Sequence, residues 1–376
     1  MMPFFTFCRS IVPFESCTKC VLLPKKFVMS SFYPLRLSKV ASITSRAVVL
    51  RFEIPEPLKT TFQYTAGQYL TLEAEIDGAL VRRSYSICSA PHEDRLEVGI
   101  KQIPNGLFST YAKQELAEGN ILNVGAPEGR FTYTPAPAKE KITAFAAGSG
   151  VTPILSIAKT ALRAEQQFTL VYGNTSPEEA MFMDVIKALQ QEFPKNFKVI
   201  HTFSRANASN AFSGRIDHDF IQAQWEAQEL MAEKYYLCGP EGMIDAVATA
   251  LKNRGTADET VFFELFTASV AADTNTAVAE TAASAKVIVV CDGLEHELKE
   301  VTQGKTILDA ALEQKIDVPY SCQGGVCSSC IARVKEGKAT MDTNQILTDG
   351  EVEEGLILTC QAHPTTDSII VDFDDI

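Results

Sequence analysis

Hydrophobic positions between residues 33 and 137 gather in short β-prone runs that are separated by turn residues. The runs cover residues 35–43, 47–54, 69–75, 82–86, 96–101 and 121–124. Turn-forming segments such as Pro55-Glu56-Pro57 and Asp77-Gly78 lie between them. Several short strands at this spacing are typical of a small antiparallel barrel, so we expect residues 33–137 to form an all-β unit.

From Lys141 the pattern changes to an alternation of strands and helices. Expected strands cover 142–147, 168–172, 198–203 and 235–238, and expected helices cover 154–164, 177–191, 217–224 and 242–253. The apolar segment 261–266 closes this part of the chain. The alternation predicts an open parallel α/β sheet over residues 138–266.

Residues 286–376 predict a third unit of mixed type. Expected strands cover 286–291, 295–302, 331–336 and 368–373, and a helix is expected over 307–314. This arrangement favours a compact β-grasp. The whole chain is therefore predicted to be a multidomain protein that combines α+β and α/β units.

Two segments show no pattern of a folded unit. Residues 1–32 mix Phe, Cys and Pro with charges, and their apolar pieces are too broken for a signal peptide. We expect an N-terminal extension, either upstream of a true start near Met29 or a disordered leader. Residues 267–285 consist mainly of Ala, Thr, Ser, Val and Asp without Gly or Pro, which predicts a flexible linker. The linker would let the last unit move, or it would be a static tether.

Charge and composition narrow the function. The chain has 376 residues and a formal charge of −13, which argues against nucleic acid as a partner. No apolar run is long enough to span a membrane. Residues 286–376 hold 7 Lys plus Arg against 17 Asp plus Glu, so most of the acidity lies there. That surface could be solubilising, or it could dock a basic redox partner. Ten cysteines without a disulfide framework indicate a reducing compartment, and we expect a cytoplasmic protein.

Four of these cysteines have the spacing of an iron–sulfur site. Cys322, Cys327 and Cys330 form C-x4-C-x2-C, and Cys360 follows in an apolar run about thirty residues later. This is the plant-type [2Fe–2S] spacing. A zinc site would usually show a second pair of ligands, and a disulfide framework is unexpected in a long chain with scattered cysteines.

The surrounding residues resemble plant-type ferredoxin domains. Residues 304–311 resemble the helix start that precedes the cluster loop in that family. The resemblance covers about the last quarter of the chain. It implies that Cys322 and Cys327 hold one iron, while Cys330 and Cys360 hold the other.

The β-rich unit carries a second group of motifs. On the expected strand 82–86, alternation places Arg83 and Tyr85 on one face and Ser84 and Ser86 on the other. Residues 106–109 open an expected helix over 109–116, whose N-terminus could receive phosphate. The Gly/Pro-rich turn 125–131 ends the region. Together these motifs resemble the flavin domain of the ferredoxin–NADP reductase superfamily.

This resemblance implies a role for each motif. Arg83 would bind the flavin pyrophosphate, Tyr85 would stack on the isoalloxazine ring, and Ser86 would approach its N5 atom. The residues expected to hold phosphate are Gly106, Leu107, Phe108 and Ser109, which favours FAD over FMN. Ser84 and Lys101 are also expected to bind the cofactor.

The α/β unit begins with a glycine-rich turn after its first strand. Gly148-Ser149-Gly150-Val151-Thr152-Pro153 would bring backbone amides and a helix N-terminus against a pyrophosphate. Pro153 replaces the third glycine of the dinucleotide fingerprint, which counts against an ordinary dehydrogenase. It resembles the loop of the same reductase superfamily, and the expected cofactor-binding residues are Gly148, Gly150, Thr152 and Pro153.

Further segments of this unit resemble the nucleotide site of that superfamily. Cys238, Gly239, Pro240 and Met243 match its nicotinamide-side loop, and Tyr172-Gly173-Asn174 matches its ribose-side loop. Cys238 could also be a small buried residue at a strand end. We expect Tyr85, Ser86 and Cys238 to be the catalytic residues.

Two further expectations concern the choice of cofactor. Ser204 and Arg205 stand where the superfamily binds the 2′-phosphate, since a guanidinium can bind it bidentately. Arg205 could also be a solvated loop residue, so we expect NADPH while NADH stays possible. Phe266 could shield the flavin or belong to the core.

The order of the three units resembles the reductase component of a multicomponent oxygenase. Electrons would pass from NADPH through FAD to the cluster and then to a terminal oxygenase. Residues 172–174, 213–217 and 341–344 resemble the reductase subunits of phenylacetyl-CoA epoxidases in phenylacetate catabolism, whose acceptor is di-iron. The alternatives are a reductase for a Rieske-type or steroid hydroxylase and, in a different class, an iron–sulfur redox sensor without turnover.

Overall fold

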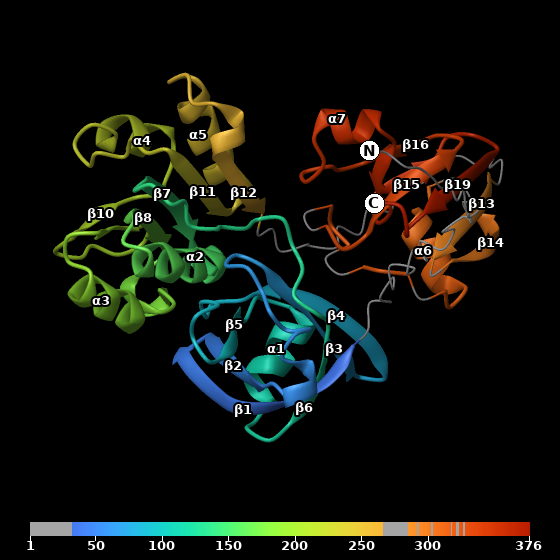
Figure 1. The fold of residues 1–376 in the computed structure, drawn as a ribbon, viewed down its shortest axis with the longest axis horizontal. Helices are drawn as coiled ribbons and strands as arrows, with labels where there is room; N and C mark the ends of the chain where they lie inside the picture. Colours follow the sequence, from blue (N-terminus) through green and yellow to red (C-terminus); the bar gives the residue numbers. More distant parts are fainter. Residues whose placement is uncertain are drawn as a thin grey trace, which may run out of the picture.

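The computed structural model describes residues 32–265, 285–291, 293–301, 304–316, 318–320, 323–325 and 328–376. The chain forms three lobes around a central meeting point (Figure 1). Several predictions lie outside the described residues: the extension up to residue 31, the linker up to residue 284, Phe266, Cys322 and Cys327. No helix among the described residues has both the length and the apolar character needed to cross a membrane.

The first lobe is the predicted antiparallel barrel. Its strands run in the spatial order β4-β3-β6-β1-β2-β5. Their bounds are β1 Tyr33–Thr44, β2 Ala47–Glu53, β3 Tyr69–Ile76, β4 Ala79–Ser86, β5 Leu96–Lys101 and β6 Ile121–Val124. A bridge between Ile87 and Val98 joins the end of β4 to β5 and so closes the sheet. Alternating apolar residues fill the interior, together with Phe108 and Ala112 of α1 (Leu107–Gln114).

The second lobe is the predicted parallel sheet, with strand order β10-β9-β8-β7-β11-β12. Its strands are β7 Lys141–Ala147, β8 Gln167–Asn174, β9 Phe197–Phe203, β10 Ala211–Ser213, β11 Lys234–Gly239 and β12 Val261–Leu265. The helices are α2 Val151–Arg163, α3 Met183–Glu192, α4 His218–Gln224 and α5 Glu241–Lys252. Because the chain adds strands first on one side of β7 and then on the other, a crevice forms at the carboxyl ends of β7 and β11.

Three predicted helices have different bounds in the structure. The helix expected over 177–191 is broken into a 3-10 turn, η3 (Pro177–Glu179), and α3, because Met181 and Phe182 both insert into the core. Helix α2 begins at Val151 and not at residue 154, since Pro153 is tolerated in a first turn. Helix α1 spans 107–114 and not 109–116, because the turn at Asn105, with φ of 59°, makes Gly106 the N-cap.

The third lobe is the predicted β-grasp. Its main sheet has the order β14-β13-β19-β15-β17, and β16 pairs with β18 beside it. The elements are β13 Ala285–Cys291, β14 Leu294–Val301, α6 Ile307–Glu313, β15 Ile331–Glu336, β16 Ala339–Met341, α7 Asp349–Glu353, β17 Leu356–Leu358, β18 Ala362–Pro364 and β19 Ser368–Asp372. The side chain of Thr306 caps α6 by accepting from the Asp309 amide.

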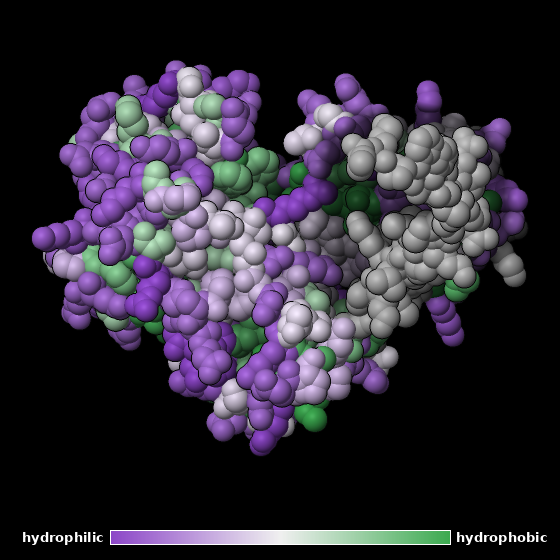
Figure 2. Space-filling model, in the orientation of Figure 1, coloured by the Kyte–Doolittle hydropathy of each residue, from purple (hydrophilic) through white to green (hydrophobic). Residues whose placement is uncertain are grey.

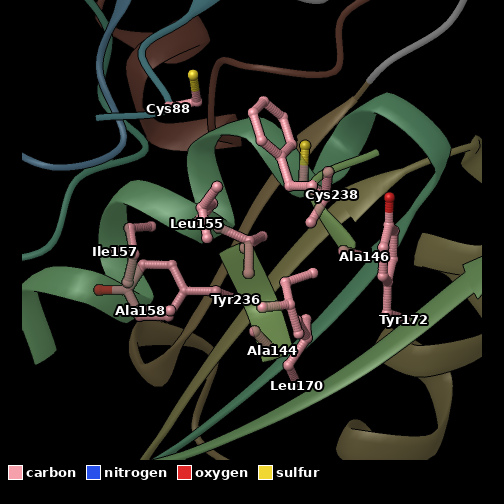
Figure 3. Close-up of a cluster of buried hydrophobic side chains, with 14 of the residues drawn as sticks. Cys88, Ala144, Ala146, Leu155, Ile157, Ala158, Leu170, Tyr172, Tyr236 and Cys238 are labelled. Carbon is pink, nitrogen blue, oxygen red and sulfur yellow. The ribbon is translucent and has the colours of Figure 1, made fainter. Parts of the chain in front are cut away.

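One hydrophobic core crosses the boundary between the first two lobes. It joins Ala47, Cys88 and Tyr133 of the barrel segment to residues of α2 and the parallel sheet. Figure 3 shows Cys88 beside this sheet and α2, where Leu155, Ile157 and Tyr236 are buried. Among the described residues, the core of the third lobe is made only by that lobe, from Val287 to Phe373. Figure 2 accordingly shows a notch between the second and third lobes.

Candidate functional site

The β3–β4 ladder displays the residues that were predicted to bind flavin. Tyr85 contacts Phe108 of α1, with ring centroids 5.6 Å apart, so the helix start lies beside β4. Burial raises the pKa of Tyr85 well above its usual range, and the phenol stays neutral. The Arg83 guanidinium donates to the Arg82 carbonyl at 2.6 Å and has no carboxylate partner among the described residues. An unneutralised guanidinium at this position fits a phosphate group.

The start of α1 offers backbone donors. The amides of Leu107, Phe108 and Ser109 donate to no acceptor in the described part of the chain. A Cβ on Gly106 would lie 2.3 Å from the Cγ1 atom of Ile103 and 2.4 Å from the Ser109 hydroxyl oxygen, so a larger residue would displace these side chains. The Ser109 hydroxyl donates locally to the Gly106 carbonyl at 3.2 Å. These three backbone amides can therefore bind a phosphate, whereas the Ser109 hydroxyl already donates its hydrogen to the Gly106 carbonyl.

Lys101 lies at the end of β5 and turns to the second lobe. Its ammonium nitrogen is 3.5 Å from the Glu179 carboxylate and 3.4 Å from the Glu179 carbonyl oxygen. The structure thus brings Lys101 to Glu179, while its predicted contact with the cofactor stays a prediction.

Glu264 connects two predicted catalytic residues, Ser86 and Cys238. The sequence analysis missed Glu264. Glu264 on β12 stands opposite Cys238 of β11 in the parallel register, and it accepts a hydrogen bond from the Ser86 hydroxyl at 3.3 Å. Glu264 is a single carboxylate in an otherwise apolar strand, which was the available signal. Its partner Ser86 is 178 positions away, so the contact itself had no sequence signal.

Burial sets the protonation states of the Glu264 and Cys238 side chains. Burial raises the pKa of Glu264 to about 8, and the hydrogen bond from Ser86 opposes that shift. Burial, reinforced by the charge of Glu264, raises the pKa of Cys238 well above its usual range. Cys238 is therefore a neutral thiol, which excludes a thiolate nucleophile. At neutral pH the Glu264 carboxyl is mostly protonated and can donate a hydrogen bond.

The crevice at the ends of β7 and β11 is shaped by glycine. Gly148 has φ of +57°, and a Cβ there would meet nothing within 4 Å, so the loop borders open space. A Cβ on Gly150 would lie 2.1 Å from the Cys238 carbonyl oxygen. The buried Thr152 hydroxyl donates to the Ser149 carbonyl at 2.9 Å, and Pro153 occupies the first turn of α2. A loop that is open on one side and closely packed on the other fits a pyrophosphate.

The nicotinamide-side and ribose-side loops flank this crevice. Pro240 is the N-cap of α5, and a Cβ on Gly239 would lie 2.8 Å from the methyl carbon of Met243. At the end of β8, Asn174 is half-buried; the polar atoms of its side chain are buried, make no hydrogen bond of standard geometry among the described residues and lie near the Tyr172 hydroxyl. A buried amide without a partner is costly, so Asn174 fits a site for a polar ligand group.

Ser204 and Arg205 lie next to Asn174. The Ser204 amide donates to the Asn174 carbonyl at 2.9 Å, and the Arg205 amide donates to the Thr175 carbonyl at 2.9 Å. Both side chains are exposed, and Arg205 has no ion-pair partner in the described part of the chain. A free guanidinium beside an unsatisfied amide fits a nucleotide that carries an additional phosphate.

Two of the four predicted cluster ligands are described, and both are buried. The carbonyl of Cys330 accepts from the amide and hydroxyl of Thr359, at 3.1 and 3.0 Å, which ties its segment to that of Cys360. The Gln361 side chain donates to the Gln323 carbonyl at 3.0 Å, and Gly325 has φ of +71°. These contacts fold the cluster loop onto the segment of the fourth cysteine, as four thiolates on two irons require.

An antiparallel barrel, a parallel α/β sheet and a β-grasp cluster domain define a flavin- and iron–sulfur-dependent oxidoreductase. Family models agree with this class. The oxidoreductase FAD-binding domain matches residues 34–133, the oxidoreductase NAD-binding domain matches 145–249, and the 2Fe-2S iron-sulfur cluster binding domain matches 289–365. The protein is an NAD(P)H-dependent oxidoreductase that uses FAD and a [2Fe–2S] cluster.

Relatives extend along nearly the whole chain. It is 37% identical over 352 residues to a component of the 1,2-phenylacetyl-CoA epoxidase of Escherichia coli (strain K12), which covers 92% of this chain and 99% of that protein. It is 32% identical to the ferredoxin reductase component of 3-ketosteroid-9-alpha-monooxygenase from Rhodococcus rhodochrous, covering 90% and 96%. Among solved structures, phthalate dioxygenase reductase has a TM-score of 0.57 at 25% identity, covering 91% of this chain and 98% of that one. The chain belongs to this family of oxygenase reductase components, which pass electrons to an oxygenase.

Proposed function

We propose that this protein supplies electrons to a di-iron oxygenase that epoxidises an aromatic acyl-CoA thioester. The name of the Escherichia coli relative gives the epoxidation of phenylacetyl-CoA, and the di-iron centre is our own addition to the proposal. The observation that carries the proposal is the 37% identity over 99% of the length of that relative. The ketosteroid monooxygenase reductase, at 32%, supports a steroid hydroxylase as the second candidate. The cysteine content of the chain favours a reducing compartment, and we place the protein in the cytoplasm.

The chain's own residues would divide the work as follows. Arg83 and the amides at the start of α1 hold the flavin phosphates, and Tyr85 covers the ring. Ser86, Glu264 and Cys238 hold the nicotinamide against the flavin and exclude water from the hydride path. When bound, FAD accepts an electron pair and releases single electrons, which the cluster passes on. Cys322, Cys327, Cys330 and Cys360 hold the two irons.

The domain limits belong to the same proposal. The barrel would end near residue 137, the nucleotide-binding domain near 266, and the ferredoxin domain would begin near 286.

The free guanidinium of Arg205 supports NADPH as the electron donor. In Arg205→Ala, the KM for NADPH should rise about tenfold or more while the KM for NADH stays unchanged, because only the 2′-phosphate loses its partner. Equal changes for both nucleotides would contradict this role.

Reconstitution tests the choice of acceptor. The purified protein is mixed with NADPH and either a phenylacetyl-CoA epoxidase oxygenase component and phenylacetyl-CoA, or a ketosteroid monooxygenase oxygenase component and its steroid. We expect NADPH consumption matched by product in the first mixture. In the Cys330→Ser variant that product should disappear, while ferricyanide reduction by the flavin persists. Product in the steroid mixture alone would overturn the proposal in favour of the second candidate.

A further inference from the structure

The cluster loop contacts the flavin barrel through a hydroxyl pair. The Tyr69 hydroxyl on β3 lies 2.8 Å from the Ser329 hydroxyl and 3.5 Å from that of Ser328. Ser328 and Ser329 stand between Cys327 and Cys330 in the sequence. Tyr69 is only 3% exposed, so this contact joins the barrel to the loop that carries the cluster ligands.

A second contact reaches the loop from its other end. The guanidinium of Arg82 on β4 lies 5.1 Å from the ring centroid of Tyr320, two residues before Cys322. The guanidinium is buried and fixed by the Glu73 carboxylate, at 2.7 Å, and this carboxylate also accepts from the side-chain amide of Asn123 at 3.0 Å. A desolvated cation over an aromatic face attracts it more strongly than an exposed one.

Both contacts start from the same face of the β3–β4 ladder. Tyr69 stands opposite Ser86, and Glu73 stands opposite Arg82, in one antiparallel register. Directly opposed residues project from the same face, as do residues separated by an even number of positions. Figure 1 shows β3 and β4 on the side of the barrel toward the third lobe. Ser86 in turn contacts Glu264 at the nicotinamide side. One rung of the ladder thus links the hydride side of the flavin site to the cluster loop.

We propose that this face of the β3–β4 ladder is the docking surface for the cluster loop, with Tyr69 and Arg82 as positioning residues for electron transfer from flavin to cluster. With FAD and the cluster bound, the hydride of NADPH and one proton from solvent would supply the flavin with two electrons. These electrons would cross this contact one at a time to the cluster and on to the acceptor, and two protons would return to solvent. The proposal does not depend on which oxygenase is the acceptor.

Anaerobic stopped-flow absorbance of the full-length protein tests the hydroxyl pair. In Tyr69→Phe, flavin reduction by NADPH should keep its rate, and cluster reduction by the flavin should slow about tenfold, which corresponds to 1.4 kcal/mol. Ser329→Ala should slow it similarly, and the double variant should show no further loss because both changes remove the same contact. The EPR spectrum and the potential of the cluster should stay unchanged.

The matched control is Tyr64→Phe, which removes a hydroxyl that bonds Ser89 at 2.9 Å within the barrel. It should leave both rates unchanged. Wild-type cluster reduction in Tyr69→Phe, equal slowing in Tyr64→Phe, or a shifted cluster potential in Tyr69→Phe would overturn the proposal.

The Arg82 contact gives an independent test. Tyr320→Leu removes the aromatic face and should slow cluster reduction, whereas Tyr320→Phe keeps the face and should not. If the Tyr69→Phe variant loses its cluster on purification, the comparison of Tyr320→Leu with Tyr320→Phe still tests the proposal. Equal rates in the Leu and Phe variants would overturn the proposal.

Discussion

The barrel shares a hydrophobic core with the nucleotide-binding lobe, whereas polar side chains make its contacts with the ferredoxin lobe. At the first boundary, apolar residues from both lobes form one cluster. At the boundary between the barrel and the ferredoxin lobe, the Tyr69 hydroxyl contacts the Ser329 hydroxyl, and the Arg82 guanidinium faces the Tyr320 ring. Burial of apolar area is worth about 25 cal/mol per Å², while a hydrogen bond contributes only about 1 kcal/mol net. The first boundary is therefore the stronger one, and the second is a weaker contact that in our proposal orients the cluster.

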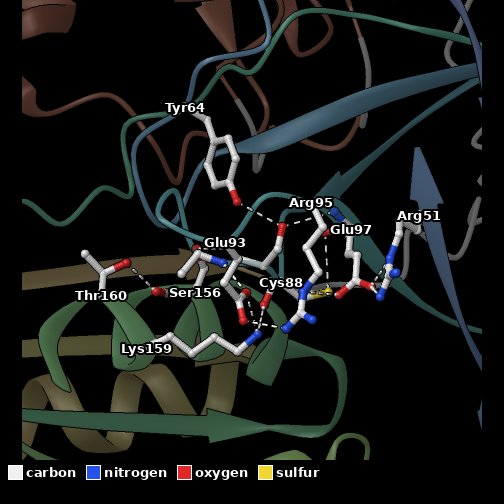
Figure 4. Close-up of polar contacts among 11 residues, drawn as sticks. Arg51, Tyr64, Cys88, Glu93, Arg95, Glu97, Ser156, Lys159 and Thr160 are labelled. Atoms are coloured by element: carbon white, nitrogen blue, oxygen red, sulfur yellow. Dashed lines mark hydrogen bonds and ion pairs between the residues drawn. The ribbon is translucent and has the colours of Figure 1, made fainter. Parts of the chain in front are cut away.

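A buried lysine reinforces the first boundary (Figure 4). The Lys159 ammonium on α2 donates to the Cys88 carbonyl at 3.2 Å and lies 3.0 Å from the Glu93 carboxylate. Nearby, the Ser156 hydroxyl donates to the Ser89 carbonyl at 2.6 Å. Burial alone would raise the pKa of Glu93, but Lys159, the Ala90 amide and Arg95 outweigh it and lower that pKa. The contribution of Glu93 is thus present at neutral pH and lost as the pH falls through its lowered pKa.

Breaking the first boundary should have the largest effect. In Lys159→Met, we expect the free energy of unfolding to fall by about 3 kcal/mol, because the half-buried Glu93 loses its main partner, the buried Lys159 ammonium. Denaturant titration, followed by release of the flavin, measures this. The cluster spectrum should persist to wild-type denaturant concentrations, since the third lobe has its own core.

The matched control is Lys139→Met. Its ion pair with Glu165 has both side chains 78% exposed, so we expect a change within about 0.5 kcal/mol. Equal destabilisation by the two substitutions would contradict the difference in kind between buried and exposed pairs.

Periodicity in the sequence was enough to predict most elements that lie within one lobe. The strands expected over 96–101, 121–124 and 331–336 have those bounds in the structure, because alternation and turn residues define them locally. The break at Phe182 was missed, because its inward position is set by tertiary packing. The same limit hid β10, β16, β18 and α7, which are too short for a period to be recognised.

The site divides in the same way. Arg83, Tyr85 and the glycine turns carry local signals, so the sequence identified them as candidates. Glu264 and Tyr69 act through partners far away in the chain, Ser86 and Ser329, and no local pattern encodes such contacts. The two boundaries between lobes were therefore the part of the molecule that the sequence could not predict.

The pH dependence of flavin reduction tests the role of Glu264 at the first boundary. Because the pKa of Glu264 is raised to about 8, its neutral form is present at neutral pH. If hydride transfer needs that neutral carboxyl, the rate of flavin reduction should fall as the pH rises through about 8, approaching tenfold per pH unit. Glu264→Gln should remove this dependence, because the amide does not titrate. Stopped-flow flavin reduction between pH 6 and 9.5 measures both, and an unchanged profile in the variant would contradict the assignment.

The stability of the folded protein should fall with rising pH, in the same direction as the rate of flavin reduction. A carboxyl with a raised pKa in the folded state contributes stability that is fully present below its unfolded pKa and is lost as the pH rises through about 8. The wild-type protein should therefore lose more stability in alkali than Glu264→Gln does. Thermal melts at pH 6 and 9 give this comparison, with Glu128→Gln as a control at a second carboxyl whose pKa is raised.

The smallest effect is expected from the exposed ion pair at the second boundary. Arg130 of the barrel segment pairs with Glu351 of α7, and the two side chains are 50% and 28% exposed. Exposed pairs are worth about 0 to 1 kcal/mol and are screened by salt. In Arg130→Ala we expect the free energy of unfolding to change by no more than about 0.5 kcal/mol. Cluster reduction should slow less than in Tyr69→Phe, and the remaining difference from wild type should vanish at high salt.

Arg130 is the right partner to change, because Glu351 has a second task. Its carboxylate accepts from the Thr348 amide and completes the capping box of α7. The Thr348 amide, followed by Arg130, lowers the pKa of Glu351, so the pair is lost only as the pH falls through that lowered pKa. Glu351→Ala would remove the helix cap as well, whereas Arg130→Ala isolates the contact between lobes. If Arg130→Ala slowed cluster reduction as much as Tyr69→Phe at any salt concentration, the ion pair and not the β3–β4 face would orient the cluster.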